Sequence, residues 1–447
     1  MSANRRDVMS GLAAVGAATA FGRVADASPA RPYRVGVIGS GWFGKLNLFT
    51  LMQVAPVEAV ALCDIDRAML EDATAQTMAR PDSVVPPTRP PKLYADYRRM
   101  LAENPFDIVI VGTPDHWHAL PALAVLKAGA NVYLEKPVTV DVIEGRALVT
   151  AARAAKRTVQ VGTQRRACKF LIEARERVVR AGLLGKVAHV DIYGFFHQRP
   201  PHFPPPAPAP AFWDVYCGPA PVVTYNSAIH PRTWRAFMEF GNGYMGDIGV
   251  HFIDCCRFLL DLRWPRTVNS SGGIYIDKQS AATVPDTQIA QFQYDDLEMT
   301  WTNRQWGQGT DPQTPWGARL YGDKGTLRIT PTGYDFTPAD AGAPTLRAEL
   351  GPELAEFPSD KALSNVDGPL FAITRENMRD FDRALRTGTR PASDIEEGYI
   401  STSICILANM SMKLGRPLHW DGEAVIGDAE ANTLLARPYR APWEHPV

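Results

Sequence analysis

The sequence RVGVIGSGWFG at residues 34–44 starts as an apolar run and ends in three glycines with the spacing G-x-G-x-x-G. The apolar run predicts a short buried strand over 34–38, and residues 45–54 predict a helix. A second strand is expected over 57–62, followed by Asp64, which lies 20 residues beyond Gly44. A strand, a glycine-rich turn, a helix, a second strand and an acid follow one another in this order in the dinucleotide-binding fingerprint.

Each glycine of this turn has a physical reason. Gly39 allows the tight turn, Gly41 lets a pyrophosphate approach the backbone, and Gly44 lets the helix pack closely on the strand. Trp42 and Phe43 belong to the same turn and are expected beside the dinucleotide. The N-terminus of the helix favours the negative charge of the phosphates.

The acid after the second strand indicates which dinucleotide to expect. Asp64 can accept hydrogen bonds from the adenosine ribose hydroxyls, and its charge would repel a 2′-phosphate. The sequence therefore favours NAD, while Arg67 nearby leaves NADP open.

Strands and helices alternate up to residue 165. Further strands are expected at 107–111, 131–134 and 159–161, and helices at 94–103, 121–128 and 142–156. This pattern predicts the α/β class, with a doubly wound parallel sheet over residues 31–165. Residues 166–447 do not alternate in this way and predict an α+β domain with a largely antiparallel sheet. Its strands are expected at 186–196, 267–276, 286–294, 297–304, 317–322 and 326–330, and its helices at 169–181, 376–386 and 397–414.

Polar residues follow the strands of the first domain, at the edge where open α/β sheets bind their ligands. Thr113, Pro114, His116 and His118 follow the strand at 107–111, and helix capping is the expected role of at least one of the two histidines. Gln164 and Arg165, which follow the strand at 159–161, are candidates to reach the nicotinamide or the substrate.

Glu135-Lys136-Pro137 follows the strand at 131–134. Alone, this tripeptide would be a surface ion pair before a turn. Behind a dinucleotide fingerprint, it places Lys136 where a bound nicotinamide meets a substrate. An ammonium there can donate to an alcohol oxygen and stabilise developing alkoxide charge.

Asp247 and His251 lie four residues apart at the start of a helix that is expected to reach about Leu260. That spacing puts both on one helical face. His251 is the natural general base, because an imidazole titrates near neutrality. Asp247 can orient that imidazole or hold a neighbouring hydroxyl. The alternative for His251 is a buried structural histidine.

Composition narrows the class of protein. The hydrophobic fraction of 45% and the charged fraction of 21% are those of a globular protein, and a net charge of -1 gives no reason to expect nucleic acid. No apolar run reaches the roughly 18 residues that a membrane span needs. None of the six cysteines forms Cys-x-x-Cys, and no Cys/His cluster has zinc spacing, so no metal site is predicted.

The N-terminus has the features of an export signal. Arg5-Arg6 precedes the apolar, small-residue run Gly11–Phe21, and Ala25-Asp26-Ala27 is an A-x-A cleavage pattern. We expect residues 1–27 to be a twin-arginine signal and the protein to be periplasmic, with a disordered basic leader as the alternative. That route carries folded proteins, which suits an enzyme that acquires its cofactor in the cytoplasm.

The ordered set of motifs resembles the glucose–fructose oxidoreductase, inositol dehydrogenase and rhizopine catabolism (Gfo/Idh/MocA) family over about residues 31–445. The motifs are the glycine-rich turn, Cys63-Asp64, Thr113-Pro114-x-His116-x-His118, Glu135-Lys136-Pro137, Trp234-Arg235, the 247–251 helix, Tyr321-Gly322-x-x-Gly325-Thr326 and Ala441-Pro442-Trp443. The resemblance implies a Rossmann domain and a C-terminal domain with an open, mostly antiparallel sheet. One face of that sheet would cover the substrate cleft, and the other would build a homodimer or homotetramer. It also implies a cis peptide bond before Pro137.

By the same resemblance, Lys136, Asp247 and His251 match the catalytic set, and Glu135 would contact the nicotinamide ribose. Trp234 and Arg235 are candidates for cofactor or substrate contact. The implied reaction moves a hydride between the nicotinamide and a secondary alcohol of a sugar or polyol.

Three alternatives remain open at this point. One is a sugar–sugar oxidoreductase that keeps its NADP bound, which export favours because free NAD is scarce outside the cytoplasm. Another is an NAD-dependent glycosidase that acts through a transient 3-keto sugar. That branch generally lacks the lysine of Glu-Lys-Pro and has a Tyr-Pro-Thr-His segment where this chain has residues 245–248. The third is a non-catalytic NAD-binding protein, which the intact acid–base set disfavours.

Overall fold

The computed structural model describes residues 31–195, 202–304, 306–309, 311, 313–362 and 368–447 of the 447. The predicted signal at 1–27 lies outside the described residues. Among the described residues, no helix is both long enough and apolar enough to cross a membrane.

The first domain is the predicted doubly wound α/β unit. Its six strands pair in parallel in the order β3-β2-β1-β4-β5-β6. They are β1 (Tyr33–Ile38), β2 (Val57–Cys63), β3 (Lys92–Tyr94), β4 (Ile108–Val111), β5 (Asn131–Leu134) and β6 (Val159–Val161). The intervening helices are α1 (Trp42–Val54), α2 (Arg67–Met78), α3 (Tyr97–Glu103), α4 (Ala119–Lys127) and α5 (Val142–Ala155). Strand order reverses between β1 and β4, which opens a crevice at the carboxyl ends of these strands.

The second sheet has nine strands in the order β14-β13-β12-β11-β7-β10-β9-β8-β15. They are β7 (Val187–Gly194), β8 (Thr267–Gly273), β9 (Thr287–Gln293), β10 (Glu298–Arg304), β11 (Trp316–Gly322), β12 (Gly325–Ile329), β13 (Gly333–Pro338), β14 (Leu346–Glu349) and β15 (Leu418–His419). All neighbours are antiparallel except β7 and β10. The expected mostly antiparallel sheet is therefore confirmed.

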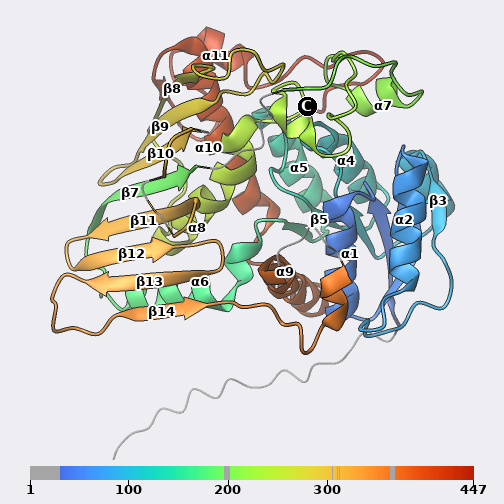
Figure 1. The fold of residues 1–447 in the computed structure, drawn as a ribbon, viewed down its shortest axis with the longest axis horizontal. Helices are drawn as coiled ribbons and strands as arrows, with labels where there is room; N and C mark the ends of the chain where they lie inside the picture. The colour runs from blue at the N-terminus through green and yellow to red at the C-terminus, as the bar shows by residue number, and fades with distance from the viewer. Residues whose placement is uncertain (1–30, 196–201, 305, 310, 312, 363–367) are drawn as a thin grey trace, which may run out of the picture.

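The two sheets face each other across a helical layer, and Figure 1 shows α8 (Val250–Leu260) and α10 (Ile395–Leu414) between them. Along β9, side chains alternate between buried and exposed, so one face of the second sheet packs on these helices and the other stays open. Trp301 on β10 is fully buried and packs in the same cluster as Ile400 and Ile404 of α10. Asp247 and His251 of the second domain lie at the start of this helical layer, toward the first domain.

Several boundaries differ from the sequence prediction. Helix α1 begins at Trp42 rather than residue 45, because Gly41 is its N-cap residue. Tyr94 ends β3, and the helix expected from 94 begins at Tyr97 behind Asp96, whose carboxylate caps it. Strand β8 stops at Gly273 rather than 276. Elements α2, β3, β13 and β14 were not expected.

The C-terminal part of the chain returns to the first domain. Helix α9 (Gly368–Thr387), which begins before the expected residue 376, places Asn377 against Tyr133 and Arg375 against Gln53. After β15 the tail passes α5, where the Val142 amide donates to the carbonyl of Leu435. Residues far apart in sequence therefore meet around the crevice.

Candidate active site

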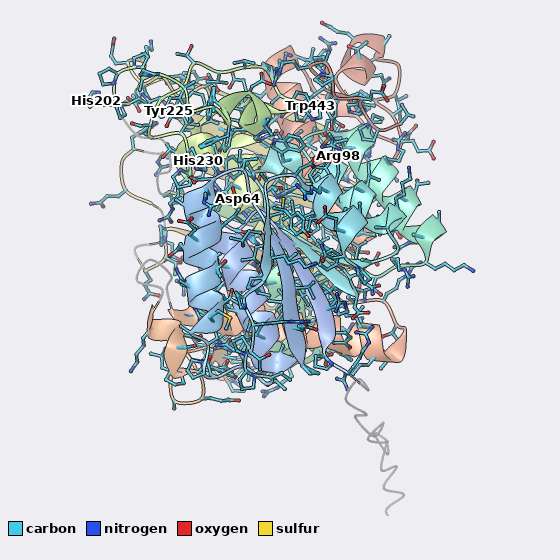
Figure 2. All side chains as sticks on the ribbon, turned by 90° about the vertical axis from the view of Figure 1, so that its right-hand side faces the viewer. Asp64, Arg98, His202, Tyr225, His230 and Trp443 are labelled. Atoms are coloured by element: carbon cyan, nitrogen blue, oxygen red, sulfur yellow. The ribbon has the colours of Figure 1, made fainter. Side chains whose placement is uncertain are left out.

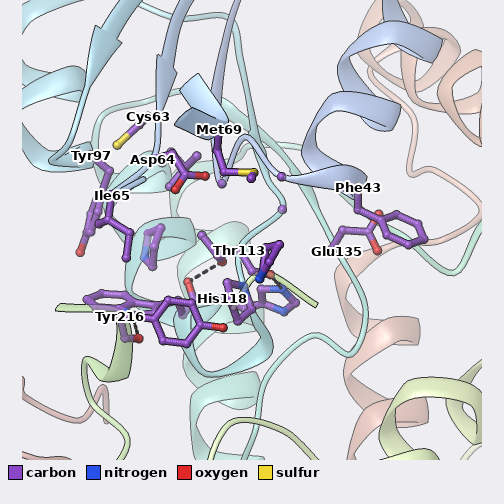
Figure 3. Close-up of a pocket in the computed structure, with 18 of the residues that line it drawn as sticks. Phe43, Cys63, Asp64, Ile65, Met69, Tyr97, Thr113, His118, Glu135 and Tyr216 are labelled. Carbon is purple, nitrogen blue, oxygen red and sulfur yellow. Dashed lines mark hydrogen bonds between the residues drawn. The ribbon is translucent and has the colours of Figure 1, made fainter. Parts of the chain in front are cut away.

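A cavity of about 630 Å³ occupies the crevice at the carboxyl ends of the parallel strands. Figure 3 shows Asp64, Ile65 and Tyr97 toward one end, and Phe43 and Glu135 toward the other. The predicted site residues that line it are Gly39, Gly41, Trp42, Phe43, Asp64, Thr113, Pro114, His118, Glu135, Lys136, Trp234 and Arg235. Of the other predicted residues, Gly44, His116, Gln164, Asp247 and His251 do not line this cavity.

The glycine-rich turn has the geometry that a pyrophosphate requires. Gly39 has a φ of +86°, which favours glycine. A Cβ at Gly41 would meet no heavy atom within 4 Å, so this position is open toward the cavity. A Cβ at Gly44 would lie 1.8 Å from the Gly39 carbonyl oxygen, so the helix packs as closely as the sequence predicted. The residues present fit a dinucleotide.

These two glycines give a matched test of the turn. We expect Gly41→Ala to weaken NAD binding about tenfold or more, because the new methyl group occupies the space of the pyrophosphate. The melting temperature should stay unchanged, since Gly41 has a φ of -70° that alanine adopts freely. Gly44→Ala should instead lower the melting temperature. NAD titration by calorimetry and a thermal melt check both, and equal NAD affinity in Gly41→Ala and the wild type would contradict the assignment.

Asp64 lies at the end of the cavity where the sequence predicts the adenosine ribose. Its carboxylate accepts the Ser40 amide at 2.8 Å and the Asp66 amide at 3.0 Å. Burial raises the pKa of Asp64, and these two hydrogen bonds oppose that rise. Arg67 pairs with Glu71 and its side chain is 83% exposed, so it is not part of this end of the cavity.

Glu135 lies buried at the opposite end. It accepts a hydrogen bond from Asn47 Nδ2 at 2.8 Å and one from the Lys136 amide at 3.2 Å. Burial raises its pKa, and these bonds with the Lys136 charge oppose the rise. Gly162 leaves room for this carboxylate, because a Cβ there would lie 2.8 Å from it.

The two histidines after β4 hold loops rather than cap a helix. His118 is the N-cap residue of α4 but makes no side-chain cap, so the capping alternative is wrong for it. Its ring contacts the carbonyl oxygens of Pro137 at 2.7 Å and Thr113 at 3.0 Å. His116 Nε2 lies 2.8 Å from the carbonyl oxygen of Tyr216. Both rings therefore tie the strand ends to neighbouring segments.

Lys136 forms the link between the two domains. Its Nζ donates to Asp247 Oδ1 at 2.6 Å and to the Asp247 carbonyl at 2.8 Å, and the expected cis bond to Pro137 is present. Arg235 Nε lies 3.5 Å from the same carboxylate. Burial alone would raise the pKa of Asp247, but the charges of Lys136 and Arg235 lower it below its usual value. Asp247 therefore stays ionised and holds the ammonium in place.

His251 is buried in the first turn of α8, just after the π-helical turn Met245–Gly249. Its ring centroid lies 6.1 Å from that of Trp316, and its Nδ1 has no hydrogen-bond partner among the described residues. Burial, with the nearby charges of Arg165 and Lys136, lowers its pKa well below the ordinary value. The imidazole is therefore neutral at pH 7 and can accept a proton.

The structure does not show Asp247 orienting that imidazole. Within the described chain, the carboxylate binds Lys136 and Arg235, and no hydrogen bond joins it to His251. The extra residue of the π-helical turn changes the i to i+4 register on which the sequence argument relied.

The remaining predicted residues lie around this centre. Trp234 is buried, and the Arg235 guanidinium lies 4.2 Å from the centroid of the Trp234 ring. Gln164 is buried in the 3₁₀ turn after β6. Arg165 beside it donates to the carbonyl of Pro331 at 2.9 Å.

Several residues that line the cavity were not predicted from the sequence. Asp115 lines the cavity, and burial raises its pKa to about 8. Tyr97, His230 and Arg232 also line it, and they come from both domains. Tyr216 and Trp443 of the Ala441-Pro442-Trp443 motif lie in the same wall. Figure 2 places His230 and Trp443 near Asp64 at the same end of the parallel sheet. Asp115 had a signal in sequence, because it lies in the polar segment that follows β4.

Three of the described side chains, Asp141, Glu144 and His445, could together hold a metal ion, although no metal site was predicted. Each already has a protein partner. His445 Nε2 lies 2.8 Å from Asp141, and Tyr439 donates to Glu144. These contacts fasten the C-terminal tail to α5.

A doubly wound sheet with a dinucleotide turn, joined to a second domain whose Asp247 holds Lys136 of the first, defines a two-domain dinucleotide-dependent oxidoreductase. Family models match residues 33–163 (oxidoreductase family, NAD-binding Rossmann fold) and 212–419 (oxidoreductase family, C-terminal alpha/beta domain). The chain belongs to the Gfo/Idh/MocA oxidoreductase family and binds NAD.

Known proteins resemble this chain in sequence over part of its length and in fold over most of it. A glycosyl hydrolase family 109 protein of Shewanella baltica is 31% identical over 171 residues, which are 37% of this chain and 35% of that protein. The chain thus spans about a third of the length of this curated relative. A levoglucosan dehydrogenase in complex with NADH and levoglucosan has a TM-score of 0.64 at 17% identity, covering 87% of this chain and 99% of that one. The WlbA dehydrogenase of Bordetella pertussis, in complex with NADH and UDP-GlcNAcA, has a TM-score of 0.62 at 19% identity, covering 88% and 99%.

Proposed function

We propose that this protein oxidises a secondary alcohol of a sugar or polyol and transfers the hydride to NAD. One observation carries the proposal: Lys136, held by Asp247, lies next to Glu135 at one end of the cavity, and the buried His251 follows Asp247 by four residues at the start of α8. A donor for an alcohol oxygen and an acceptor for its proton are the groups that this reaction needs.

Each residue of the site has a distinct role in this reaction. Gly39, Gly41 and Asp64 bind the dinucleotide, and Glu135 orients its nicotinamide ribose. NAD, when bound, supplies the hydride acceptor. Lys136 donates a hydrogen bond to the substrate oxygen and stabilises the charge that develops there. His251 takes the proton from that oxygen.

The fold neighbours are consistent with this class of substrate. The levoglucosan dehydrogenase binds an anhydrosugar, and WlbA binds a sugar nucleotide. Asp64 favours NAD over NADP, because its carboxylate lines the cavity and its negative charge would repel a 2′-phosphate.

A glycosidase that works through a transient keto sugar is the second candidate. The glycosyl hydrolase family 109 relatives favour it, and the partial coverage limits what they contribute. Lys136 in the Glu-Lys-Pro turn supports the dehydrogenase instead. A sugar–sugar oxidoreductase with retained cofactor is a variant of the first proposal.

The test is a substrate panel followed at 340 nm with purified protein and added NAD. Continuous formation of NADH supports the dehydrogenase. A stoichiometric rise that stops supports a retained cofactor, and NAD-dependent release of p-nitrophenol from aryl glycosides supports the glycosidase. No NADH and no p-nitrophenol from any sugar would reject both.

Export and assembly belong to the same proposal. Residues 1–27 support twin-arginine export to the periplasm, and the open face of the second sheet suits a homodimer or homotetramer. Cell fractionation with an Arg5→Lys, Arg6→Lys variant tests the first, and light scattering of the purified protein tests the second.

A further inference from the structure

Arg165 is a buried cation close to the proposed general base. It follows β6 in the 3₁₀ turn Gln164–Ala167 and is only 4% exposed. Its guanidinium lies 4.8 Å from the ring centroid of Trp316 and 5.5 Å from that of Phe252. Its charge is the nearby charge with the largest effect in lowering the pKa of His251.

Most N–H donors of the Arg165 guanidinium have no hydrogen-bond partner among the described residues. An arginine has five N–H donors, and here the Nε bond to the carbonyl of Pro331 is the one hydrogen bond that the described residues provide. No carboxylate of the described part of the chain acts on it. The groups whose charge raises its pKa are the thiols of Cys255 and Cys168, and burial lowers that pKa below the ordinary value.

The other buried arginines among the described residues differ in this respect. Each lies beside or in the field of an acid: Arg166 binds Asp254 and Glu397, Arg257 binds Glu397, Arg375 binds Asp360 and Glu353, and Arg80 is attracted by Asp82. The contrast between Arg165 and Arg166 is sharpest, because they are adjacent in sequence and equally buried. A buried charge without a counter-charge is costly, so proteins rarely keep one without a partner.

The position of Arg165 indicates where the missing anion comes from. The Trp316 ring lies beside both the Arg165 guanidinium and the His251 ring, so the cation and the proposed base flank the same indole. The charge of Lys136 also acts on His251, but Asp247 already neutralises that ammonium. Arg165 is therefore the group in this site that an anionic substrate would satisfy.

We propose that the substrate is a polyhydroxy acid, a sugar or polyol whose carboxylate binds Arg165 while its secondary alcohol faces Lys136 and His251. This inference rests on the proposed dehydrogenase function and narrows its substrate class. The guanidinium can bind a carboxylate through two parallel N–H···O bonds, which fixes the orientation of the carbon chain.

The reaction balances with the groups already named. The alcohol loses its hydroxyl proton to His251 and its carbon-bound hydride to NAD, giving a ketone, NADH and one proton. The carboxylate is unchanged in the product. It serves only to place the reacting alcohol.

The first test compares substrates that differ by one group. D-gluconate is compared with D-glucitol, and D-galacturonate with D-galactose, using the wild-type protein with NAD. We expect kcat/KM for the acid to exceed that of its neutral partner about 10- to 100-fold, the usual effect of a charge-assisted hydrogen bond. Direct binding is measured in parallel through quenching of tryptophan fluorescence in the protein–NADH complex, since Trp316 stacks on Arg165.

The second test changes the arginine. Arg165→Gln should reduce the preference for the acid to near unity, and Arg165→Lys, which keeps the charge but not the planar fork, should retain part of it. The loss should appear mainly in KM for the acid. Arg177→Gln is the matched control, because Arg177 is exposed and pairs with Glu173 on the surface. Its substrate preference should equal that of the wild type.

The outcomes separate the two proposals. Equal kcat/KM for acid and neutral partner, with turnover of both, overturns the anion inference and leaves the dehydrogenase standing. Tight binding of the acids that requires Arg165, without any NADH formation, supports the anion site and rejects the dehydrogenase. Acids that neither bind nor react overturn the inference, whatever the neutral sugars do.

Discussion

We expect Lys136→Ala to lower kcat about 100- to 1000-fold while NAD still binds, the size of effect seen when one donor to a developing oxyanion is removed. The structure explains the separation of these two effects. The ammonium is held by Asp247 from the second domain, whereas Gly39, Gly41 and Asp64 line other parts of the cavity, where we propose that the rest of the dinucleotide binds. Initial rates at 340 nm and an NAD titration measure both quantities.

A second variant guards against loss of the fold. Lys136→Met keeps the length of the side chain, and Asp247 still has Arg235 at 3.5 Å. The surface variant Lys127→Ala is the control and should turn over like the wild type. A kcat for both Lys136 variants within about threefold of the wild type would remove Lys136 from the reaction, because a general donor contributes far more than that.

Replacing His251 by glutamine should have the other large effect, a fall in kcat of about 100- to 10,000-fold together with a changed pH profile. The wild-type base must be neutral to accept a proton. Its pKa is lowered well below the ordinary value by burial and by the charges of Arg165 and Lys136. In the wild type, kcat/KM should therefore stay level through neutral pH and fall only when acid protonates the imidazole.

The His251→Gln variant should lose the acidic limb of the pH profile, which is the fall of kcat/KM in acid. With no base in place, the remaining rate should rise about tenfold for each unit of pH as hydroxide takes the proton, because the base is then supplied by solvent. Profiles of kcat/KM from pH 5 to 10 distinguish this from damage to the fold, which would lower the whole curve without changing its shape. An acidic limb that persists in His251→Gln would assign the titration to another group.

The first domain could be predicted closely because its signals are local. The apolar runs at 34–38, 107–111 and 131–134 became strands β1, β4 and β5, and the glycine turn joined β1 to α1. Asp64 follows β2 at the expected distance and lies in the cavity. A parallel sheet buried on both faces leaves continuous apolar segments, which are read directly from sequence.

The partners of the site residues could not be predicted in the same way. Lys136 and Asp247 are 111 residues apart, and nothing in either segment specifies that they meet. The π-helical turn at 245–249 was also invisible, since it depends on packing rather than on composition. The short strands β13 and β14 lie at the edge of the second sheet, where pairing rather than apolar content defines them.

The C-terminal tail has a consequence for how the protein is made. Trp443 forms part of the wall of the NAD cavity, and Tyr439 and His445 fasten that segment to Glu144 and Asp141. A ribosome that has produced only the first domain has produced the glycine turn but not this wall. Enclosure of NAD thus follows synthesis of residue 443, and a protease that trims the tail would reopen the site while leaving the Rossmann sheet whole.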